Sequence, residues 1–375
     1  MSKVDDLIAK LCPNGVEYKA LEEVCSTISA GGDLPEHYEK GQLIPTDRFP
    51  YPIYSNGSNK NSLYGFTDTY RIDQDAVTVS ARGTIGYHAV RKKFFTPIVR
   101  LITLLPDNRI ITAEFLNYAL DITEIGHSGG SIPQLTVPNI KKVCIPVPPL
   151  EIQREIVKVL DTFTKLEAEL EAELEARRRQ YHYYSDQLLN FEGRDDVQWM
   201  TLVEVATIGT GSRNTNEAIP EGKYPFFVRS QQPLRIDEFE FDEISIITAG
   251  DGVGVGKVFH FVHGKYALHQ RAYRIHITSS YLNPKFIFYF IRNNFARYLA
   301  TTSVHASVTS LRKPMFEKYP IPVPSLEEQT RIVTTLDKFD ALVNDLSSGL
   351  PAEIAARRKQ YEYYRDRLLT FKEAQ

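Results

Sequence analysis

The sequence predicts an α+β fold in which two similar α/β domains are separated by two long helices packed as an antiparallel coiled coil. Three observations predict it: an internal repeat across the two halves of the chain, two long apolar stripes at helical spacing, and short β-branched segments between the stripes. Together they describe a chain with a pseudo-twofold internal repeat.

The repeat is clearest at the two ends of each stripe. The segment "PVPPLEIQREIVKVLDTF" from Pro146 recurs as "PVPSLEEQTRIVTTLDKF" from Pro322, and "ARRRQYHYYSDQLLNF" from Ala176 recurs as "ARRKQYEYYRDRLLTF" from Ala356. A duplication whose copies took unrelated tasks is the alternative. Because the helical parts stayed most alike while the parts between them diverged, two similar frames holding two different heads is the simpler interpretation.

The repeat divides the chain into two heads, which differ, and two rods, which match. We expect the first head at residues 1–149, the first rod at 150–191, the second head at 192–325 and the second rod at 326–375. Within the heads, "AVTVSARG", "PIVRLITLLP", "ISIITAGDG" and "AYRIHIT" are typical of strands, and "AEFLNYALDI" and "PKFIFYFIRNNFARYL" are typical of helices. Each head is therefore expected to be an α/β domain.

Each rod carries apolar residues every three or four positions, the spacing of one helix face. A helix of roughly forty residues is ~60 Å long, which exceeds most globular helices and calls for a coiled-coil partner. The expected packing residues are Ile156, Phe163, Leu166, Leu170, Leu174, Tyr181 and Leu188 in the first rod, and Ile332, Leu336, Phe339, Leu346, Leu350, Ile354, Tyr361 and Leu368 in the second.

Charges on the rods favour an antiparallel pairing. That orientation would set the acidic stretch 167–175 near the basic residues 357–359, and the basic residues 177–179 near Asp340 and Asp345. For any single pair, an equally good interpretation is that the charges only face solvent.

The second rod contains a break signal that the first rod lacks. In "SSGLPAEI", Gly349 and Pro351 follow two serines, a pattern that ends one helix and starts another. We therefore expect the second rod to consist of two helices.

Composition and motifs argue against a membrane protein, a metalloprotein or an enzyme. The net charge is −3, and the chain has three cysteines and nine histidines, none at metal-ligand spacing. No apolar run approaches the ~18 residues of a membrane span, and scattered cysteines suit a reduced, cytoplasmic compartment. The glycine-rich "GDGVGVG" from Gly250 lacks the Lys-Ser/Thr of a phosphate loop and predicts a turn between strands. We expect no catalytic residues, no metal and no cofactor in this chain.

The rod motifs resemble those of the DNA-specificity subunits of type I restriction–modification systems. They are Pro-x-Pro-x-Leu-Glu-x-Gln-x-x-Ile-Val and Arg-Arg-x-Gln-Tyr-x-Tyr-Tyr-x-x-x-Leu-Leu, each present twice, and the head segments "VSARGTIGY" and "SGGSIPQLT" agree. The resemblance implies that each head is a target-recognition domain for one half of a bipartite site in double-stranded DNA. It implies rods that space the heads and dock methyltransferase subunits. Those partners would methylate adenine N6 with S-adenosylmethionine, and an added motor-nuclease subunit would cleave unmodified DNA.

Sequence-specific readout needs hydrogen-bonding side chains at base edges and cations at phosphates. Polar loops of the heads supply both, although for each single residue a solvated loop or turn cap is as good an interpretation. In the first head the candidates are Tyr54, Asn56, Asn59, Lys60, Asn61, Ser80, Arg82, Thr84, His127, Ser128, Ser131 and Gln134. In the second they are Arg213, Asn214, Arg229, Gln231, Gln232, His269, Gln270, Arg271, His305, Ser307, Ser310 and Arg312.

Two other function classes compete with DNA readout. One is a two-headed scaffold whose heads bind proteins and whose rods serve assembly. The other is a stand-alone enzyme, which predicts turnover by the purified chain. The bases read, the half assigned to each head and the gap between half-sites do not follow from the sequence.

Overall fold

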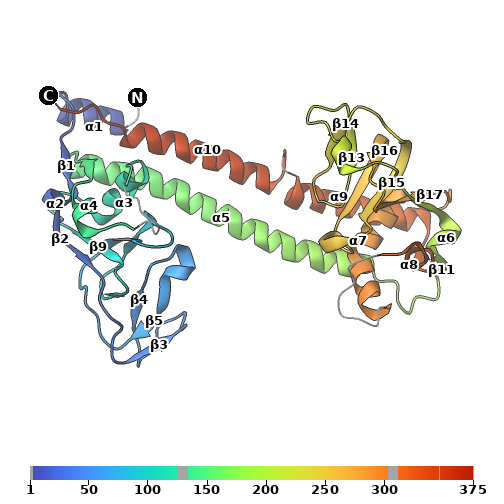
Figure 1. Cartoon of the computed structure of the whole chain (residues 1–375), viewed down its shortest axis with the longest axis horizontal. Helices are drawn as coiled ribbons and strands as arrows, with labels where there is room; N and C mark the ends of the chain where they lie inside the picture. Colours follow the sequence, from blue (N-terminus) through green and yellow to red (C-terminus); the bar gives the residue numbers. More distant parts are fainter. Residues whose placement is uncertain (1–2, 126–133, 303–310, 346, 375) are drawn as a thin grey trace. The chain divides into compact units, whose positions relative to one another are not determined.

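The computed structural model describes residues 3–125, 134–302, 311–345 and 347–374, and the chain divides into two compact units (Figure 1). Unit 1 comprises Met1–Leu170 and Ile354–Gln375, and unit 2 comprises Glu171–Glu353. Each unit thus contains one head together with parts of both rods.

Unit 1 is a mixed α/β domain. Its strands form two four-stranded sheets, of order β2-β9-β6-β7 and β3-β5-β4-β8, and the two-stranded ladder β1-β10. Its elements are α1 (Lys3–Leu11), β1 (Tyr18–Ala20), α2 (Leu21–Val24), β2 (Cys25–Ala30), β3 (Tyr38–Lys40), β4 (Tyr51–Tyr54), η1 (Asn59–Ser62), β5 (Leu63–Thr67), β6 (Ala76–Val79), β7 (His88–Arg91), β8 (Thr96–Pro97), β9 (Ile102–Pro106), α3 (Ala113–Asp121), α4 (Val137–Lys141), β10 (Cys144–Pro146), the first part of α5 (Leu150–Leu188) and most of α10 (Leu350–Leu369).

Unit 2 repeats this plan with a larger sheet. Its strands form a six-stranded sheet of order β12-β17-β15-β16-β13-β14 and the ladder β11-β18. Its elements are the second part of α5, β11 (Gln198–Thr201), α6 (Leu202–Val205), β12 (Ala206–Thr210), η2 (Thr215–Glu217), β13 (Tyr224–Phe227), β14 (Leu234–Ile236), β15 (Phe241–Ala249), η3 (Gly252–Gly254), β16 (Phe259–Leu268), β17 (Ala272–Ile277), α7 (Pro284–Thr302), α8 (Lys313–Glu317), β18 (Pro320–Val323), α9 (Leu326–Asn344) and the start of α10.

The two sheets share a topological core. Strands β2-β9-β6-β7 of unit 1 and β12-β17-β15-β16 of unit 2 have the same order, and every neighbouring pair is antiparallel. The segments predicted as strands lie in β6, β9, β15 and β17, and those predicted as helices are α3 and α7. The predicted α+β class with two similar α/β domains is therefore confirmed.

Each unit pairs α5 with a second rod helix in antiparallel orientation. In unit 1, Phe163 of α5 stacks on Tyr364 of α10 with ring centroids 5.3 Å apart, and Glu167, farther along α5, accepts from Arg358, which precedes Tyr364. In unit 2, Tyr184 of α5 stacks on Phe339 of α9 at 5.7 Å. The repeat aligns Phe163 with Phe339 and Tyr364 with Tyr184, so the same aromatic pair recurs with the helices exchanged.

The expected packing residues lie on the covered faces of the rods. Ile156, Leu174, Tyr181, Ile332, Leu336, Ile354 and Leu368 are buried, and Phe163, Leu166, Leu170, Leu188, Phe339, Leu350 and Tyr361 are half-buried. Leu346 lies outside the described residues.

The predicted break in the second rod is confirmed. Helix α9 ends at Asn344 and α10 begins at Leu350. Gly349 is required there because a Cβ would come within 2.4 Å of the carbonyl oxygen of Ala341. Asp345 accepts hydrogen bonds from the side chains of Ser347 and Ser348, which lower its pKa to about 2.

Of the two predicted charge pairings between the rods, the structure contains one. Glu167 and Arg358 form the expected ion pair, at 2.5 Å. Residues 177–179 were expected near Asp340 and Asp345, but among the described contacts Arg177 bonds Glu173 and Gln180, and Arg178 bonds Glu175, all on their own helix. The described contacts pair Asp340 with Arg292 of α7 instead, because a helix of the head packs against this part of the rod.

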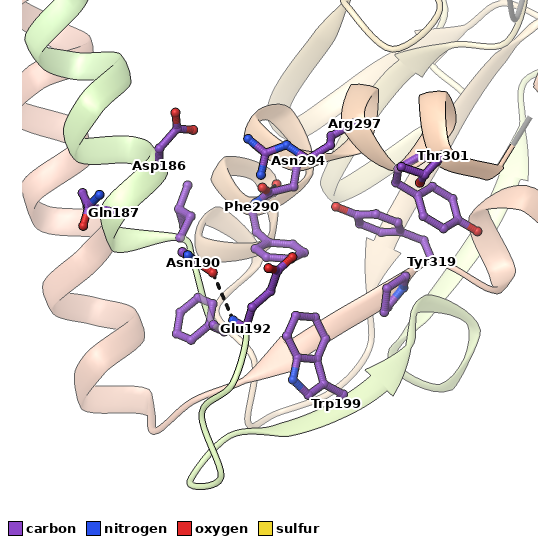
Figure 2. Close-up of a pocket in the computed structure, with 14 residues that line it drawn as sticks. Asp186, Gln187, Asn190, Glu192, Trp199, Phe290, Asn294, Arg297, Thr301 and Tyr319 are labelled. Carbon is purple, nitrogen blue, oxygen red and sulfur yellow. Dashed lines mark hydrogen bonds between the residues drawn. The ribbon is translucent and has the colours of Figure 1, made fainter. Parts of the chain in front are cut away.

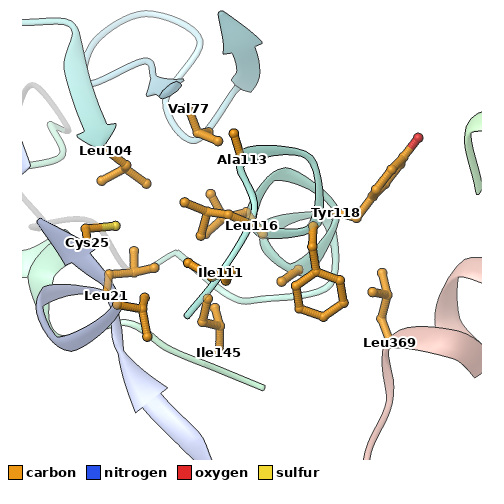
Figure 3. Packing of buried hydrophobic residues seen from close by; sticks show 14 of the residues in the cluster. Leu21, Cys25, Val77, Leu104, Ile111, Ala113, Leu116, Tyr118, Ile145 and Leu369 are labelled. Carbon is orange, nitrogen blue, oxygen red and sulfur yellow. The ribbon is translucent and has the colours of Figure 1, made fainter. Parts of the chain in front are cut away.

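A buried glutamine joins each head to its rod. Gln153 is 0% exposed; its Nε2 donates to the carbonyl oxygens of Ile110 and Pro148, and its Oε1 accepts from the backbone N–H of Thr112. In unit 2, the equivalent Gln329 makes the same three kinds of bond. The rods are therefore parts of the domains, and in Figure 3 Leu369 of α10 closes the hydrophobic core of the first head.

Candidate nucleic-acid interface

Equivalent turns close the same edge of the two sheets. One joins β6 to β7 and the other joins β15 to β16, and each begins with a glycine in the left-handed region, Gly83 (φ 70°) and Gly252 (φ 79°). Leu135 donates to the carbonyl of Ala81 in the first turn, and Leu311 donates to that of Gly250 in the second. The predicted glycine-rich turn between strands is thus confirmed, and it has a counterpart in unit 1.

In unit 1 the turn is tied to the polar loop after β4. The Asn56 amide accepts from Ala81 N–H and donates to the carbonyl of Val99, and the buried Ser80 hydroxyl bonds both backbone groups of Gly57. These two side chains use their polar atoms internally. They hold exposed candidates at the surface of the same edge, namely Asn59, Asn61, Arg82 and Thr84.

In unit 2 an acidic residue organises the turn. Asp251 accepts from Arg229 at 2.7 Å and from Arg271 at 3.2 Å. Burial works to raise the pKa of Asp251, but the hydrogen bonds and charges of the two guanidinium groups outweigh it and lower the pKa. The ionised carboxylate therefore holds two cations side by side, and their side chains remain 43% and 62% exposed.

Neighbouring candidates of unit 2 are mostly engaged with one another. Arg213 bonds Glu217 and Glu238, so its charge is compensated. Gln270 donates to Asn214. His269 is 5% exposed, and its Nδ1 accepts from Arg271 N–H; burial lowers its pKa, and the nearby guanidinium groups add to the effect. His269 shapes the backbone beneath Arg271 rather than facing solvent.

The remaining candidates fall into two groups. Gln231, Gln232 and Arg312 are exposed, Tyr54 is half-buried beneath the Arg91 guanidinium, and Gln134 accepts from Arg82. Outside the described residues lie His127, Ser128, Ser131, His305, Ser307, Ser310 and the side chain of Lys60. Contact with DNA stays a prediction for every member of the set.

Two residues at this edge were missed by the sequence reasoning. Asp251 was read as part of a glycine turn, and Val253, 96% exposed at the tip of that turn, was not considered. An acidic residue in the counterpart of a predicted DNA-contacting turn is itself a signal, because it repels phosphate unless it serves to hold arginines.

Other chemistry is not apparent in the described part of the chain. No group of three His, Cys, Asp or Glu side chains there could hold a metal ion. No helix in the same residues has an apolar stretch long enough to cross a bilayer.

Comparisons with known proteins place these features in one family. The family described as "Type I restriction modification DNA specificity domain" matches twice, over residues 13–176 and 194–356. The specificity subunit of the Escherichia coli type I restriction enzyme EcoR124I/EcoR124II is 32% identical over 302 residues, which are 73% of this chain and 74% of the relative.

Solved structures share the fold. The S subunit of the type I restriction–modification system of M. genitalium has a TM-score of 0.64 at 17% identity, covering 95% of this chain and 96% of the other. A chain from a study of complex assembly and conformational transition of the type I R-M system has a TM-score of 0.59 at 17% identity, with 95% and 98% covered.

Proposed function

Because this chain belongs to the family of type I restriction–modification DNA specificity subunits, we propose that each head reads one half of a bipartite DNA site. Chains of this family select the DNA sequence and are not catalytic. The observation that carries the proposal is the pair of equivalent turns with guanidinium groups at their edge: Arg82 in unit 1, and Arg229 and Arg271 on Asp251 in unit 2. Arginine is suited to guanine and to phosphate.

The rods would set the half-site spacing and dock the methyltransferase subunits. Helix α5 runs without interruption for 39 residues, as a spacer requires. Tyr183 and Tyr363 occupy equivalent places in the repeat, and each is 62% exposed on its rod. Exposed aromatic residues are enriched in protein interfaces, so the two tyrosines are suitable anchors for two copies of one partner.

Catalysis would belong to the partners. S-adenosylmethionine is expected on the methyltransferase subunit, and a motor-nuclease subunit would join for cleavage. We propose that the complex works in the cytoplasm, where it would meet its DNA and these partners. A protein-interaction scaffold without DNA readout, the competing function, has no support in the comparisons.

The test is to produce the chain with a family methyltransferase partner and to map the methylated adenines. We expect one bipartite motif with a fixed gap. A second chain with one more "LEAE" unit in α5 gains ~6 Å of helix, so the gap should lengthen by about one or two base pairs at ~3.4 Å each. Methylation without a bipartite motif would reject the proposal.

A further inference from the structure

Unit 2 contains a cavity of ≈ 410 Å³ where the end of α5, helix α7 and the β11-β18 ladder meet (Figure 2). Its lining combines aromatic side chains, among them Phe191, Trp199, Phe290 and Tyr319, with polar and charged ones. Cavities of several hundred Å³ with apolar walls and a few polar groups are the usual form of small-ligand sites. None of the residues expected to contact DNA lines this cavity.

The cavity contains a buried hydroxyl without a partner. Tyr319 is 2% exposed, and its Oη makes no hydrogen bond to the described residues. Figure 2 shows the hydroxyl end of this side chain turned toward Asn294 and Phe290, within the cavity. An unpaired buried hydroxyl is costly in a folded protein, and a ligand that hydrogen-bonds it would remove that cost.

Charged side chains of both signs line the cavity and favour a neutral group against its walls. They are Asp186, whose carboxylate accepts from Asn293, and Glu192 and Arg297, neither of which forms an ion pair with a described residue. A cationic group there would meet Arg297, and an anionic group would meet the two carboxylates. A neutral, planar group with donors on one edge and acceptors on another can use both, while it stacks on the aromatic walls.

The first head lacks this combination. The repeat places Val143 where unit 2 has Tyr319, and Ala119 where it has Phe290. Tyr18 replaces Trp199, and its hydroxyl donates to the carbonyl of Phe371 at 3.3 Å. The aromatic cavity is therefore a property of unit 2 and not of the shared frame.

We propose that this cavity binds a nucleobase. The ring stacks on Trp199 or Phe290, its amino group donates to Glu192, and a ring nitrogen or carbonyl accepts from Tyr319 or Arg297. Bases stack on aromatic side chains regardless of sequence. The base comes either from a free purine nucleotide or from an unpaired base of a single strand. The proposal stands apart from the bipartite readout, because it uses other residues.

The chain reports on this site through its own fluorescence, since Trp199 is its single tryptophan. The full-length protein is titrated with adenosine monophosphate and, separately, with a short single-stranded oligonucleotide, with N-acetyltryptophanamide as the control for light absorption. We expect saturable quenching. Saturation by the mononucleotide identifies a free nucleotide as the source, and saturation by the oligonucleotide alone identifies a base in a strand.

Variants tie the signal to the cavity. Tyr319→Phe removes only the unpaired hydroxyl, so the protein should stay folded by circular dichroism and bind about tenfold more weakly. Tyr70→Phe, at an exposed tyrosine of unit 1 (44% exposed), should bind like the parent. Trp199→Tyr, followed by calorimetry, should also bind more weakly. The proposal is overturned by an absence of saturation at millimolar ligand, by equal binding of Tyr319→Phe and parent, or by a preference for N-acetylargininamide, which would indicate a basic side chain of a protein partner.

Discussion

The two units keep the same contacts between head and rod but differ at the edge of the sheet. Gln153 and Gln329 are both fully buried and bond equivalent backbone groups. Tyr118 donates to Asp161 in unit 1, and Tyr289 donates to Asp337 in unit 2. The repeat is thus preserved where side chains bond the backbone or each other at the rod, since such bonds tolerate no change of one partner alone.

The units differ at the edge of the sheet and on the helix that follows it, α3 in unit 1 and α7 in unit 2. Asp251 in unit 2 stands where unit 1 has Arg82, and Arg292 in α7 stands where α3 has Asp121. Arginines surround Asp251, whereas Arg82 donates to the neutral Gln134. At the other position the surrounding charges are reversed: Arg292 donates to Asp340, and Asp121 lies near His88 and Arg365. The comparison teaches that the frame is kept while the charges it carries change from one unit to the other.

The largest expected effect comes from the buried glutamines. Gln153→Leu leaves the carbonyls of Ile110 and Pro148 and the N–H of Thr112 without partners, and should lower the free energy of unfolding by about 3 kcal/mol. Gln329→Leu should cost about as much, measured by urea denaturation. Gln198→Leu, an exposed position, should change it by less than about 0.5 kcal/mol. A large cost in one unit and none in the other would break the equivalence.

The stacked aromatic pairs of the rods should show a smaller, matched effect. Phe163→Ala and Phe339→Ala each remove a half-buried ring from the stack, with an expected loss of about 2 kcal/mol each. The exposed Thr162→Ala is the control. Thermal denaturation of the three variants compares the pairs directly, and unequal losses would mean that only one pair holds its rods together.

The sheet edge that we propose to read bases should respond one half-site at a time. Arg82→Ala and Arg271→Ala are each expected to cost about 1–3 kcal/mol at the base they contact, measured by binding to DNA with a single half-site altered. Each variant should leave the other half-site unchanged. Equal weakening on every sequence would instead make the side chain a phosphate contact. Arg109→Ala, whose side chain is 88% exposed and paired with Asp107, is the control.

The Asp251 carboxylate, which holds Arg229 and Arg271, should contribute to discrimination between DNA sequences. Asp251→Asn removes the charge that fixes Arg229 and Arg271, so it should raise affinity for all DNA while reducing discrimination by roughly 1 kcal/mol. Competition between specific and random duplexes measures this. Unchanged discrimination would show that the contacts of Asp251 with the two arginines only stabilise the turn.

The rods and the break in the second rod were predictable from the sequence, but the contacts between side chains at the candidate site were only partly so. Periodicity gives the rods because each turn of a helix repeats the same face, and Gly349 and Pro351 mark the break through local backbone chemistry. The burial of Ser80 was not predictable, since its hydroxyl bonds Gly57 in a loop more than twenty residues earlier in the chain. Arg213 is neutralised by Glu238, far along the chain, and no local pattern shows that pairing.

The smallest expected effect concerns the charge that differs between α3 and α7. The Asp121 side chain is 31% exposed and lies 3.5 Å from Nε2 of His88. Burial raises the pKa of Asp121, and the charges of His88 and Arg365 only partly oppose this. The folded-state pKa therefore lies above the ordinary 3.8, so the ionised carboxylate destabilises the fold at neutral pH. That cost is relieved as the pH falls through the folded-state pKa, and it is gone below 3.8.

Asp121→Asn mimics the protonated acid and should sharpen the comparison with Arg292. At neutral pH we expect the variant to be more stable than the parent by less than about 1 kcal/mol, with the gain shrinking toward zero as the pH is lowered. Urea denaturation at several pH values measures it, with the exposed Asp47→Asn as the control. A variant less stable at neutral pH would mean that attraction to His88 and Arg365 exceeds the cost of burial. In that case the charge at this position would stabilise both units, as a carboxylate near cations in unit 1 and as a guanidinium near a carboxylate in unit 2.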